Sequence, residues 1–266
     1  MKYALESLIK RPICLNLILE IHSMLLDSVR GYDKSRGIFR KVQNYIGRPG
    51  AKIEDAQYIA PSPELVQDCM SNLEKYIHYD EKDELVQLAI IHAQFEIIHP
   101  FLDGNGRLGR ILIPLFLFEK GLIIQPVFYM SDYLEKKRGQ YYERLRGITM
   151  ENDWSGWILF FLEAVENQAR LNIEKALKIL SLYEEMKKRI PEITHSQYSI
   201  NTLDAIFYTP IFTTSYFIQN SKIPKQSALH ILNSLRKEDI LEAIRERRGR
   251  QPATLSFSKL VEIVKA

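Results

Sequence analysis

Apolar positions along this chain recur mostly at helical spacing. After a break at Pro12, the apolar residues of 15–26 fall on one helix face at intervals of three and four. The segment 83–98 is apolar on almost every side, which predicts a buried central helix. Further helices are predicted at about 62–78 and at 106–120. We therefore expect a mainly α fold.

Three other segments complete the region before residue 190. Residues 46–63 are rich in glycine and proline with short apolar pairs on either side, so they form either a loop or an exposed β-hairpin. Residues 132–147 are predicted to form a polar, amphipathic helix. Asn152 or Asp153 can cap a long helix that continues towards Lys188.

The composition changes near Pro191. From residue 186 to the end the chain has thirteen Lys or Arg against seven Asp or Glu, a local balance of +6, so the remainder carries about −3. Three short helices followed by a basic turn and a strand are typical of a winged helix-turn-helix. We place the boundary near 190, which gives domains of 1–190 and 191–266. The predicted elements of the tail are helices at about 201–208, 213–220 and 224–237, followed by the basic segment 245–257.

Size and composition set broad limits. The chain has 266 residues, 46% hydrophobic and 26% charged, which suits one large domain or two smaller ones. Its net charge of +3 does not require nucleic acid or a membrane as a partner. Cys14 and Cys69 are too few for a disulfide framework and lack metal-site spacing. No signal peptide opens the chain and no apolar stretch spans a bilayer, so we expect a cytoplasmic location and no membrane partner.

The segment 99–110, HPFLDGNGRLGR, contains GNGRLG, which fits the G-x-G-x-x-G pattern of dinucleotide-binding loops. That fingerprint needs a strand before its first glycine and an acidic residue after a second strand. Here the preceding segment is the apolar helix 83–98, which stops at His99-Pro100. The sequence therefore excludes a Rossmann loop.

The glycines suit a different anion-binding loop. Gly104, Asn105 and Gly106 lie directly before a helix, so free backbone N–H groups there can surround a phosphate that the glycines allow to approach. Arg107 and Arg110 are three residues apart and therefore lie on one helix face near the same loop. Two guanidinium groups beside such a loop favour a polyphosphate over a monoanion.

Two further residues of the segment suggest a reaction. Asp103 is a single carboxylate at the edge of the loop, and one carboxylate with phosphate oxygens and water is a usual arrangement for Mg²⁺. His99 can accept a proton from an attacking hydroxyl. Taken singly, each residue has an ordinary explanation as a helix-ending histidine, a turn residue or a surface ion pair. Their occurrence together within 99–110 favours a nucleotide site.

The whole segment resembles the signature of the Fic family, H-x-F-x-[DE]-G-N-G-R-x-x-R. The likeness extends from about residue 5 to 162, with landmarks at 37–47 (GIFRKVQNYIG), 93–101 and 152–162, and the tail resembles the winged helix of a common bacterial Fic architecture. The resemblance implies a Fic-type helical core with a small β-hairpin flap. The signature positions, all matched, are His99, Phe101, Asp103, Gly104, Asn105, Gly106, Arg107 and Arg110.

This resemblance implies AMPylation, in which ATP with Mg²⁺ donates AMP to a Ser, Thr or Tyr hydroxyl of a target protein and releases pyrophosphate. In that scheme His99 is the general base and Asp103 holds Mg²⁺. The loop 104–106 binds the α- and β-phosphates, Arg107 contacts phosphate, and Arg110 serves the γ-phosphate or an inhibitory competitor. Relatives that phosphorylate proteins carry Lys in place of the second motif glycine, so the glycine found here favours AMP transfer.

Other segments correspond to parts of the family site. Residues 46–63 correspond to the flap, which adds a strand to the edge of the target segment. The helix 131–145 lies where relatives close the adenine pocket, and Tyr141 and Tyr142 either contribute to that pocket or belong to the core. Lys137 stands where close relatives carry Asn, a departure in the contacts to the nucleotide base.

An inhibitory element of the family is missing. Relatives usually carry an upstream helix with [ST]-x-x-x-E-[GN], whose glutamate pairs with the last motif arginine. ALESLIK (4–10) resembles a segment well after that helix, and neither Glu151 nor Glu166, each followed by Asn, has Ser or Thr four residues earlier. Either the chain is shortened, or we expect constitutive activity or an inhibitory partner protein acting in trans.

The tail leaves two interpretations open. The helix that opens at Lys225 would be a DNA-recognition helix with Ser227 and His230 exposed, or the winged helix serves docking or dimerisation, so a homodimer stays open. A second function of another class is a nucleotide-sensing, DNA-binding regulator, which the intact His99 disfavours because a sensor needs no base. The arginines that could contact DNA phosphates from the wing are Arg245, Arg247, Arg248 and Arg250.

Overall fold

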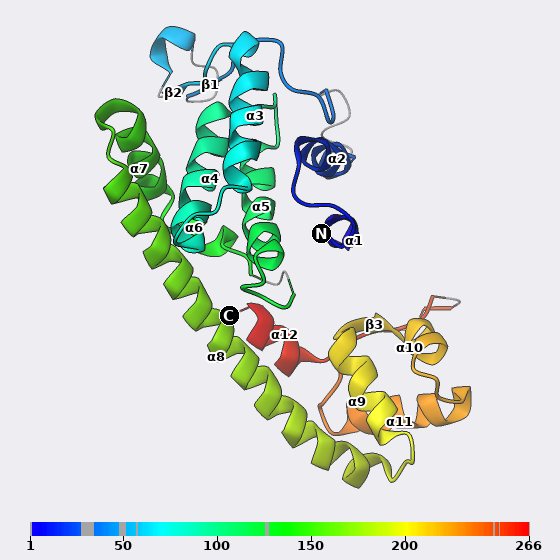
Figure 1. The fold of residues 1–266 in the computed structure, drawn as a ribbon. Helices are drawn as coiled ribbons and strands as arrows, with labels where there is room; N and C mark the ends of the chain where they lie inside the picture. The colour runs from blue at the N-terminus through cyan, green and yellow to red at the C-terminus, as the bar shows by residue number, and fades with distance from the viewer. Residues whose placement is uncertain are drawn as a thin grey trace. The chain divides into compact units, whose positions relative to one another are not determined.

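The protein is mainly α-helical with a few short strands, as predicted (Figure 1). It divides into two compact units, Met1–Ala169 and Arg170–Ala266, and the division falls inside one continuous helix, α8 (Trp154–Thr194). The domain boundary expected near 190 lies later in the same helix and stays a prediction. The computed structural model describes residues 2–27, 35–47, 52–56, 58–125, 128–246, 248–249 and 251–265.

The first unit consists of helices and one short pair of strands. The helices predicted at 15–26, 62–78, 83–98 and 106–120 are confirmed, with small shifts of their ends. In chain order the elements are α1 (Lys2–Leu8), α2 (Leu15–Leu25), β1 (Tyr45–Ile46), the 3₁₀ turn Ile53–Asp55, β2 (Tyr58–Ile59), the 3₁₀ turn Pro63–Leu65, α3 (Val66–Ile77), α4 (Glu84–Ile98), α5 (Asn105–Glu119), α6 (Ser131–Lys136), α7 (Arg138–Glu151) and the start of α8.

Helix α4 packs against both α3 and α5. Its first turn is capped by the Asp83 carboxylate, which accepts hydrogen bonds from the backbone N–H groups of Leu85 and Val86. Because α4 is apolar on nearly all sides, eight of its fifteen residues are buried and the other seven are half-buried, and the Trp157 indole donates to the Ala89 carbonyl 2.8 Å away. The motif therefore begins at the end of a well-packed helix.

The prediction of a single helix at 132–147 is wrong, because two helices occupy this region. The backbone leaves helical geometry at Lys137 (φ −103°, ψ 23°), which separates α6 from α7. Gly139 follows the break, and glycine is the weakest helix former after proline. The apolar positions keep helical spacing on both sides of the break, so the sequence pattern does not show it. Helix α7 then runs beyond the predicted end and stops at Asn152 in the left-handed region (φ 58°).

Helix α8 also runs further than predicted. It passes through Pro191 and ends at Thr194 rather than near Lys188. Pro191 lacks the N–H that would donate to the Lys187 carbonyl, and the buried Thr194 hydroxyl donates to the Ile190 carbonyl at 2.7 Å in the same last turn. The described helices include none that is long and apolar enough to cross a membrane.

The second unit has helices close to the three predicted positions and a small antiparallel sheet. The sheet has the order β3-β5-β4, with Phe212 opposite Leu255 and Ala243 opposite Leu255 on the other side. Leu182, Met186 and Ile190 of α8 contribute to the core of this unit. Strand β3 and the last helix were not predicted. The elements are α9 (Ser199–Tyr208), β3 (Ile211–Thr213), α10 (Thr214–Asn220), α11 (Lys225–Lys237), β4 (Glu242–Arg245), β5 (Thr254–Ser256) and α12 (Ser258–Lys265).

Candidate active site

His99 ends α4 in a left-handed conformation (φ 49°, ψ 59°) directly before Pro100. A residue that precedes proline disfavours the right-handed helical region, so the helix has to stop here. The Nδ1 atom of His99 lies 3.3 Å from the Glu96 carbonyl oxygen. Since a carbonyl oxygen only accepts, Nδ1 carries the proton and Nε2 keeps the lone pair. Burial, with a smaller contribution from Arg40, lowers the pKa of His99 below 6.5 and favours this neutral form.

Arg40 holds the end of α4, a role that the sequence patterns did not indicate. Among the described residues this buried guanidinium donates to main-chain oxygens: Nε to His99 at 2.9 Å, Nη1 to Val42 at 3.2 Å, and Nη2 to Pro61 at 2.6 Å and to Ile98 at 3.3 Å. Its own backbone N–H donates to the Pro100 carbonyl at 2.9 Å. Arg40 therefore connects the chain on both sides of His99 to the segment that follows β2.

His22 is a second anchor that sequence reasoning missed. Its ring is buried and stacks on Phe101 with a centroid distance of 3.7 Å. The Gly37 N–H donates to Nδ1 at 2.9 Å, so Nε2 carries the proton and donates to the Asp103 carbonyl at 2.9 Å. Burial lowers the pKa of His22, consistent with this neutral tautomer. In the sequence His22 is only one polar residue on an apolar helix face.

The motif loop is closed by a pair of hydrogen bonds between Asn105 and Phe101. The Phe101 N–H donates to Oδ1 of Asn105 at 2.9 Å, and Nδ2 of Asn105 donates back to the Phe101 carbonyl at 2.7 Å. Both residues are buried. The Asn105 side chain is thus occupied inside the loop, which leaves only its backbone N–H to face a ligand.

Gly104 begins α5 in the left-handed region (φ 84°), a conformation that favours glycine. Its own N–H donates to Oδ1 of Asp103 at 2.7 Å. The backbone N–H groups of Asn105, Gly106 and Arg107 have no hydrogen-bond partner among the described residues. These three donors stand at the start of a 15-residue helix, one residue later than the loop 104–106 expected from the sequence, and anion binding there stays a prediction.

Five of the predicted site residues line one polar cavity of about 300 Å³ beside this helix start. The second carboxylate oxygen of Asp103 lies 3.7 Å from Nη2 of Arg107, and both side chains are 45% exposed. The opposite wall comes from α6 and α7. The lining residues are Asp103, Gly104, Gly106, Arg107, Arg110, Ser131, Leu134, Glu135, Arg138, Tyr141 and Tyr142.

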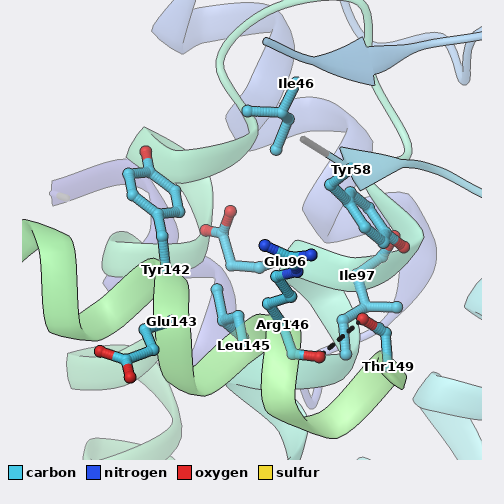
Figure 2. Close-up of a pocket in the computed structure, with 9 residues that line it drawn as sticks. All are labelled: Ile46, Tyr58, Glu96, Ile97, Tyr142, Glu143, Leu145, Arg146 and Thr149. Carbon is cyan, nitrogen blue, oxygen red and sulfur yellow. Dashed lines mark hydrogen bonds between the residues drawn. The ribbon is translucent and has the colours of Figure 1, made fainter. Parts of the chain in front are cut away.

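A second, more apolar pocket of about 300 Å³ shares Tyr142 with the polar cavity. Figure 2 shows Ile46 and Tyr58 entering it from the two short strands, opposite Leu145 and Arg146 of α7. Strands β1 and β2 pair antiparallel with Ile46 opposite Tyr58, so the segment 46–63 contains a paired hairpin rather than a plain loop. Its residues 48–51 and 57 lie outside the described part. The lining residues are Ile46, Tyr58, Glu96, Ile97, Tyr142, Glu143, Leu145, Arg146 and Thr149.

Tyr141 and Tyr142 therefore have different surroundings. Tyr141 belongs mainly to the core: its ring is buried, and its hydroxyl lies 3.0 Å from Nε2 of the buried His92. Tyr142 is 44% exposed and stands between the two cavities. The sequence left open whether these residues line a pocket, and Tyr142 is the one placed to contact a ligand in both.

Glu96 lines the apolar pocket from α4. Figure 2 shows its carboxyl group directed toward the middle of the apolar pocket. Oε1 is buried and has no hydrogen-bond partner among the described residues. A Cβ on Gly109 would lie 2.4 Å from this atom, so α5 approaches closely because it carries glycine there. Burial raises the pKa of Glu96 to about 7, although Arg110 acts in the opposite direction.

Comparisons with known proteins agree with this geometry. The profile of the Fic/DOC family matches residues 12–117. The chain is 28% identical over 211 residues to the protein adenylyltransferase Fic of Drosophila mojavensis, which covers 76% of this chain and 36% of that protein. It is 39% identical over 69 residues to a probable protein adenylyltransferase of Aquifex aeolicus, 26% of this chain and 22% of that protein. The chain spans about a third of the length of the first of these relatives.

The fold has a solved counterpart as well. A crystal structure of a Fic family protein from Desulfovibrio desulfuricans superposes with a TM-score of 0.57 at 19% identity, covering 96% of this chain and 72% of that one. An identity of this level supports a similar fold and nothing more. The profile match covers α2 through most of α5 and includes every motif residue described above. Residues 12–117 are therefore a domain of the Fic/DOC family.

Proposed function

We propose that this protein is a protein adenylyltransferase that moves AMP from ATP to a Ser, Thr or Tyr hydroxyl of a target protein. The observation that carries the proposal is the placement of His99 Nε2, neutral and unprotonated, in the loop that leads directly into an uncapped helix start. The names of the similar proteins, which are protein adenylyltransferases, support the same activity.

In this proposal the polyphosphate binds in the polar cavity. The N–H groups of Asn105, Gly106 and Arg107 would donate to the α- and β-phosphates, and the guanidinium groups of Arg107 and Arg110 would contact phosphate oxygens. The apolar pocket next to it has the size and lining for a nucleoside base, with Tyr142 positioned between base and phosphates. Lys137 does not line either cavity, so its departure from the family pattern does not conflict with a base bound there.

His99 would act as the general base. Nε2 takes the proton from the target hydroxyl as its oxygen forms a bond to the α-phosphorus, and the bond from that phosphorus to the β-phosphate oxygen breaks. Pyrophosphate then leaves with the electron pair. The backbone donors at the start of α5 would neutralise charge that develops on the α-phosphate oxygens.

Asp103 is the residue that would hold Mg²⁺. Its Oδ1 accepts the Gly104 N–H, while its other oxygen lies 3.7 Å from the Arg107 guanidinium beside the polar cavity. The described residues contain no cluster of three metal-ligating side chains, so a cation here would have to take its remaining ligands from phosphate and water, as Mg²⁺ commonly does. When bound, the ion would supply positive charge between the phosphates.

We propose a winged helix-turn-helix for the second unit and leave its ligand as a prediction. In the predicted recognition helix α11 His230 is exposed and Ser227 is half-buried, and on the wing Arg245 and Arg248 are exposed. Arg247 and Arg250 lie outside the described residues. DNA binding, an inhibitory partner in trans and a cytoplasmic location stay predictions.

The test is transfer of label from ATP to protein. Purified chain is incubated with Mg²⁺ and either α-³²P-ATP or γ-³²P-ATP, in the presence of cell lysate as a source of targets. AMP transfer predicts protein-bound label from the α position only, lost in His99→Ala and kept in His78→Ala, which alters an exposed histidine outside the site. Label from the γ position would indicate phosphorylation. No label with ATP binding intact would favour the nucleotide-sensing regulator.

A further inference from the structure

Helix α8 carries an apolar stripe that its own chain does not cover in the described structure. Ile173, Leu177 and Leu180 follow one another at intervals of four and three, so they share one face, and they are 60%, 60% and 57% exposed. The core of the second unit takes the opposite face, through residues such as Leu182 and Met186. We call Ile173, Leu177 and Leu180, with the charged residues that flank them on the same face, the outer stripe.

The flanking charges are arranged symmetrically about Leu177. Arg170 lies seven residues before it and Glu184 seven residues after it, which is about 10.5 Å in either direction along the axis. One turn further out, Glu166 lies eleven residues before Leu177 and Lys188 eleven residues after it. In both pairs the positive charge on one arm therefore corresponds to a negative charge at the same distance on the other.

We propose that the outer stripe is a self-complementary interface through which two copies of this chain pair with their α8 helices antiparallel, about a two-fold axis at Leu177. In this arrangement Ile173 meets Leu180 of the second copy, and Leu177 meets its own equivalent. Arg170 faces Glu184 of the second copy. The outer pair, Glu166 and Lys188, meets in the same way, so both flanking contacts join opposite charges, while Arg170 and Glu166 keep the interactions that each has within its own chain.

The order of the charges along α8 also disfavours a parallel pairing of the two helices. A parallel pairing would set Arg170 against Arg170, and Glu184 against Glu184, so each flanking layer would hold like charges. The weak contact of Lys187 with Glu184 in the same helix, 3.9 Å between Nζ and Oε1, is exposed and can be shared with a facing helix. The stripe therefore selects a second copy and also sets its direction and register.

The interface is modest in size. Three apolar side chains from each copy form its centre. We therefore expect the segment 166–188 to bury a smaller area than the roughly 800 Å² per partner of a standard interface. Dimerisation is therefore expected to be reversible and to depend on protein concentration.

Sedimentation velocity of the full chain from about 1 to 200 µM tests the proposal. We expect a monomer–dimer equilibrium whose dissociation constant rises about tenfold or more in Leu177→Glu, because two carboxylates then meet at the axis. Leu229→Glu is the matched control. Leu229 is 41% exposed but lies on α11, outside the outer stripe, so dimerisation should not change.

A charge exchange tests the register independently. Arg170→Glu alone and Glu184→Arg alone each place like charges opposite one another and should weaken the dimer, whereas the two changes together restore opposite charges and should restore it. Thermal unfolding of each variant checks that α8 is intact. The proposal is overturned by a chain that stays monomeric up to the highest concentration, by a dimer that Leu177→Glu leaves unchanged, or by a double variant no tighter than the singles.

Discussion

The Nδ1 atom of His99 lies 3.3 Å from the carbonyl oxygen of Glu96, one turn earlier in α4. This contact assigns the imidazole tautomer, because the carbonyl cannot donate and Nδ1 must therefore carry the proton. The direction of the remaining lone pair is then set by the end of α4, which Arg40 ties to its surroundings through main-chain oxygens. The position of the proposed base thus follows from backbone geometry rather than from a neighbouring carboxylate.

The pH dependence of AMP transfer should reflect this environment. Because burial lowers the pKa of His99 below its ordinary 6.5, the neutral base is present above that value and is lost only at lower pH. We expect initial rates of AMP incorporation to stay above half of their maximum from about pH 8 down to 6.5 and to fall further at lower pH. A rate that is already half-maximal at pH 6.5 or above would contradict this assignment, provided that the circular dichroism spectrum is unchanged over the same range.

Asn105 and Arg107 should differ sharply when each is changed to alanine. Asn105→Ala leaves the buried N–H and C=O of Phe101 without partners, so the free energy of unfolding should fall by about 2–4 kcal/mol. Arg107→Ala removes a half-exposed ion pair, so stability should change by less than about 0.5 kcal/mol while ATP affinity falls about tenfold. Urea unfolding and isothermal titration with ATP measure the two effects. Equal stability losses in both variants would be inconsistent with this division of roles.

Two glycines in the same backbone conformation offer a matched comparison. Gly104 (φ 84°) begins α5, and Gly121 (φ 73°) follows its end. A Cβ on Gly104 would make only ordinary contacts, at 3.5 Å from His22 and Leu26, and one on Gly121 would meet nothing within 4 Å. Each change to alanine should therefore cost about 1–2 kcal/mol of stability through its backbone conformation. Only Gly104→Ala should also weaken ATP binding, because only this position shapes the nest; equal ATP affinity in both variants would argue against it.

Much of the fold was predictable because burial imposes a period on the sequence. The helices around α4 show their apolar faces at intervals of three and four, and the motif loop shows its glycines and its charged residues directly. The joint at Lys137 was not predictable, since apolar positions on both sides keep helical spacing across it. The continuation of α8 through Pro191 was not predictable either, since proline usually ends or kinks a helix and no other residue in the sequence marks the continuation.

The supporting residues of the site were hidden for a different reason. Arg40 and His22 donate hydrogen bonds to main-chain carbonyl oxygens of residues far away in the sequence. Every residue type has such an oxygen, so the sequence does not show which ones are bound. Glu96 was hidden because it lies in a segment that is apolar on almost every side, where a single carboxylate suggests an exposed edge. The opposite holds: its Oε1 atom is buried.

Glu96 should make stability decrease as the pH rises. Its pKa is about 7 in the folded protein against an ordinary 4.5, so the folded state holds this proton more tightly than the unfolded state does. The resulting stabilisation is complete below about pH 4.5 and is lost as the pH rises through about 7, when a buried charge must form. The difference corresponds to at most about 3 kcal/mol. Glu96→Gln, which cannot ionise, should lose this dependence and be more stable than the wild type above pH 8.

Urea unfolding at intervals between pH 5.5 and 8.5 measures this effect, with Glu143→Gln as the control. Glu143 lines the same pocket from α7 but is exposed, so its replacement should leave the slope of stability against pH as in the wild type. If Glu96→Gln keeps the wild-type slope, some other group binds the proton on folding. If ATP stabilises the wild type at high pH more than it stabilises Glu96→Gln, a ligand in the pocket supplies the partner that Oε1 of Glu96 lacks, which would identify Glu96 as a residue that contacts the nucleotide.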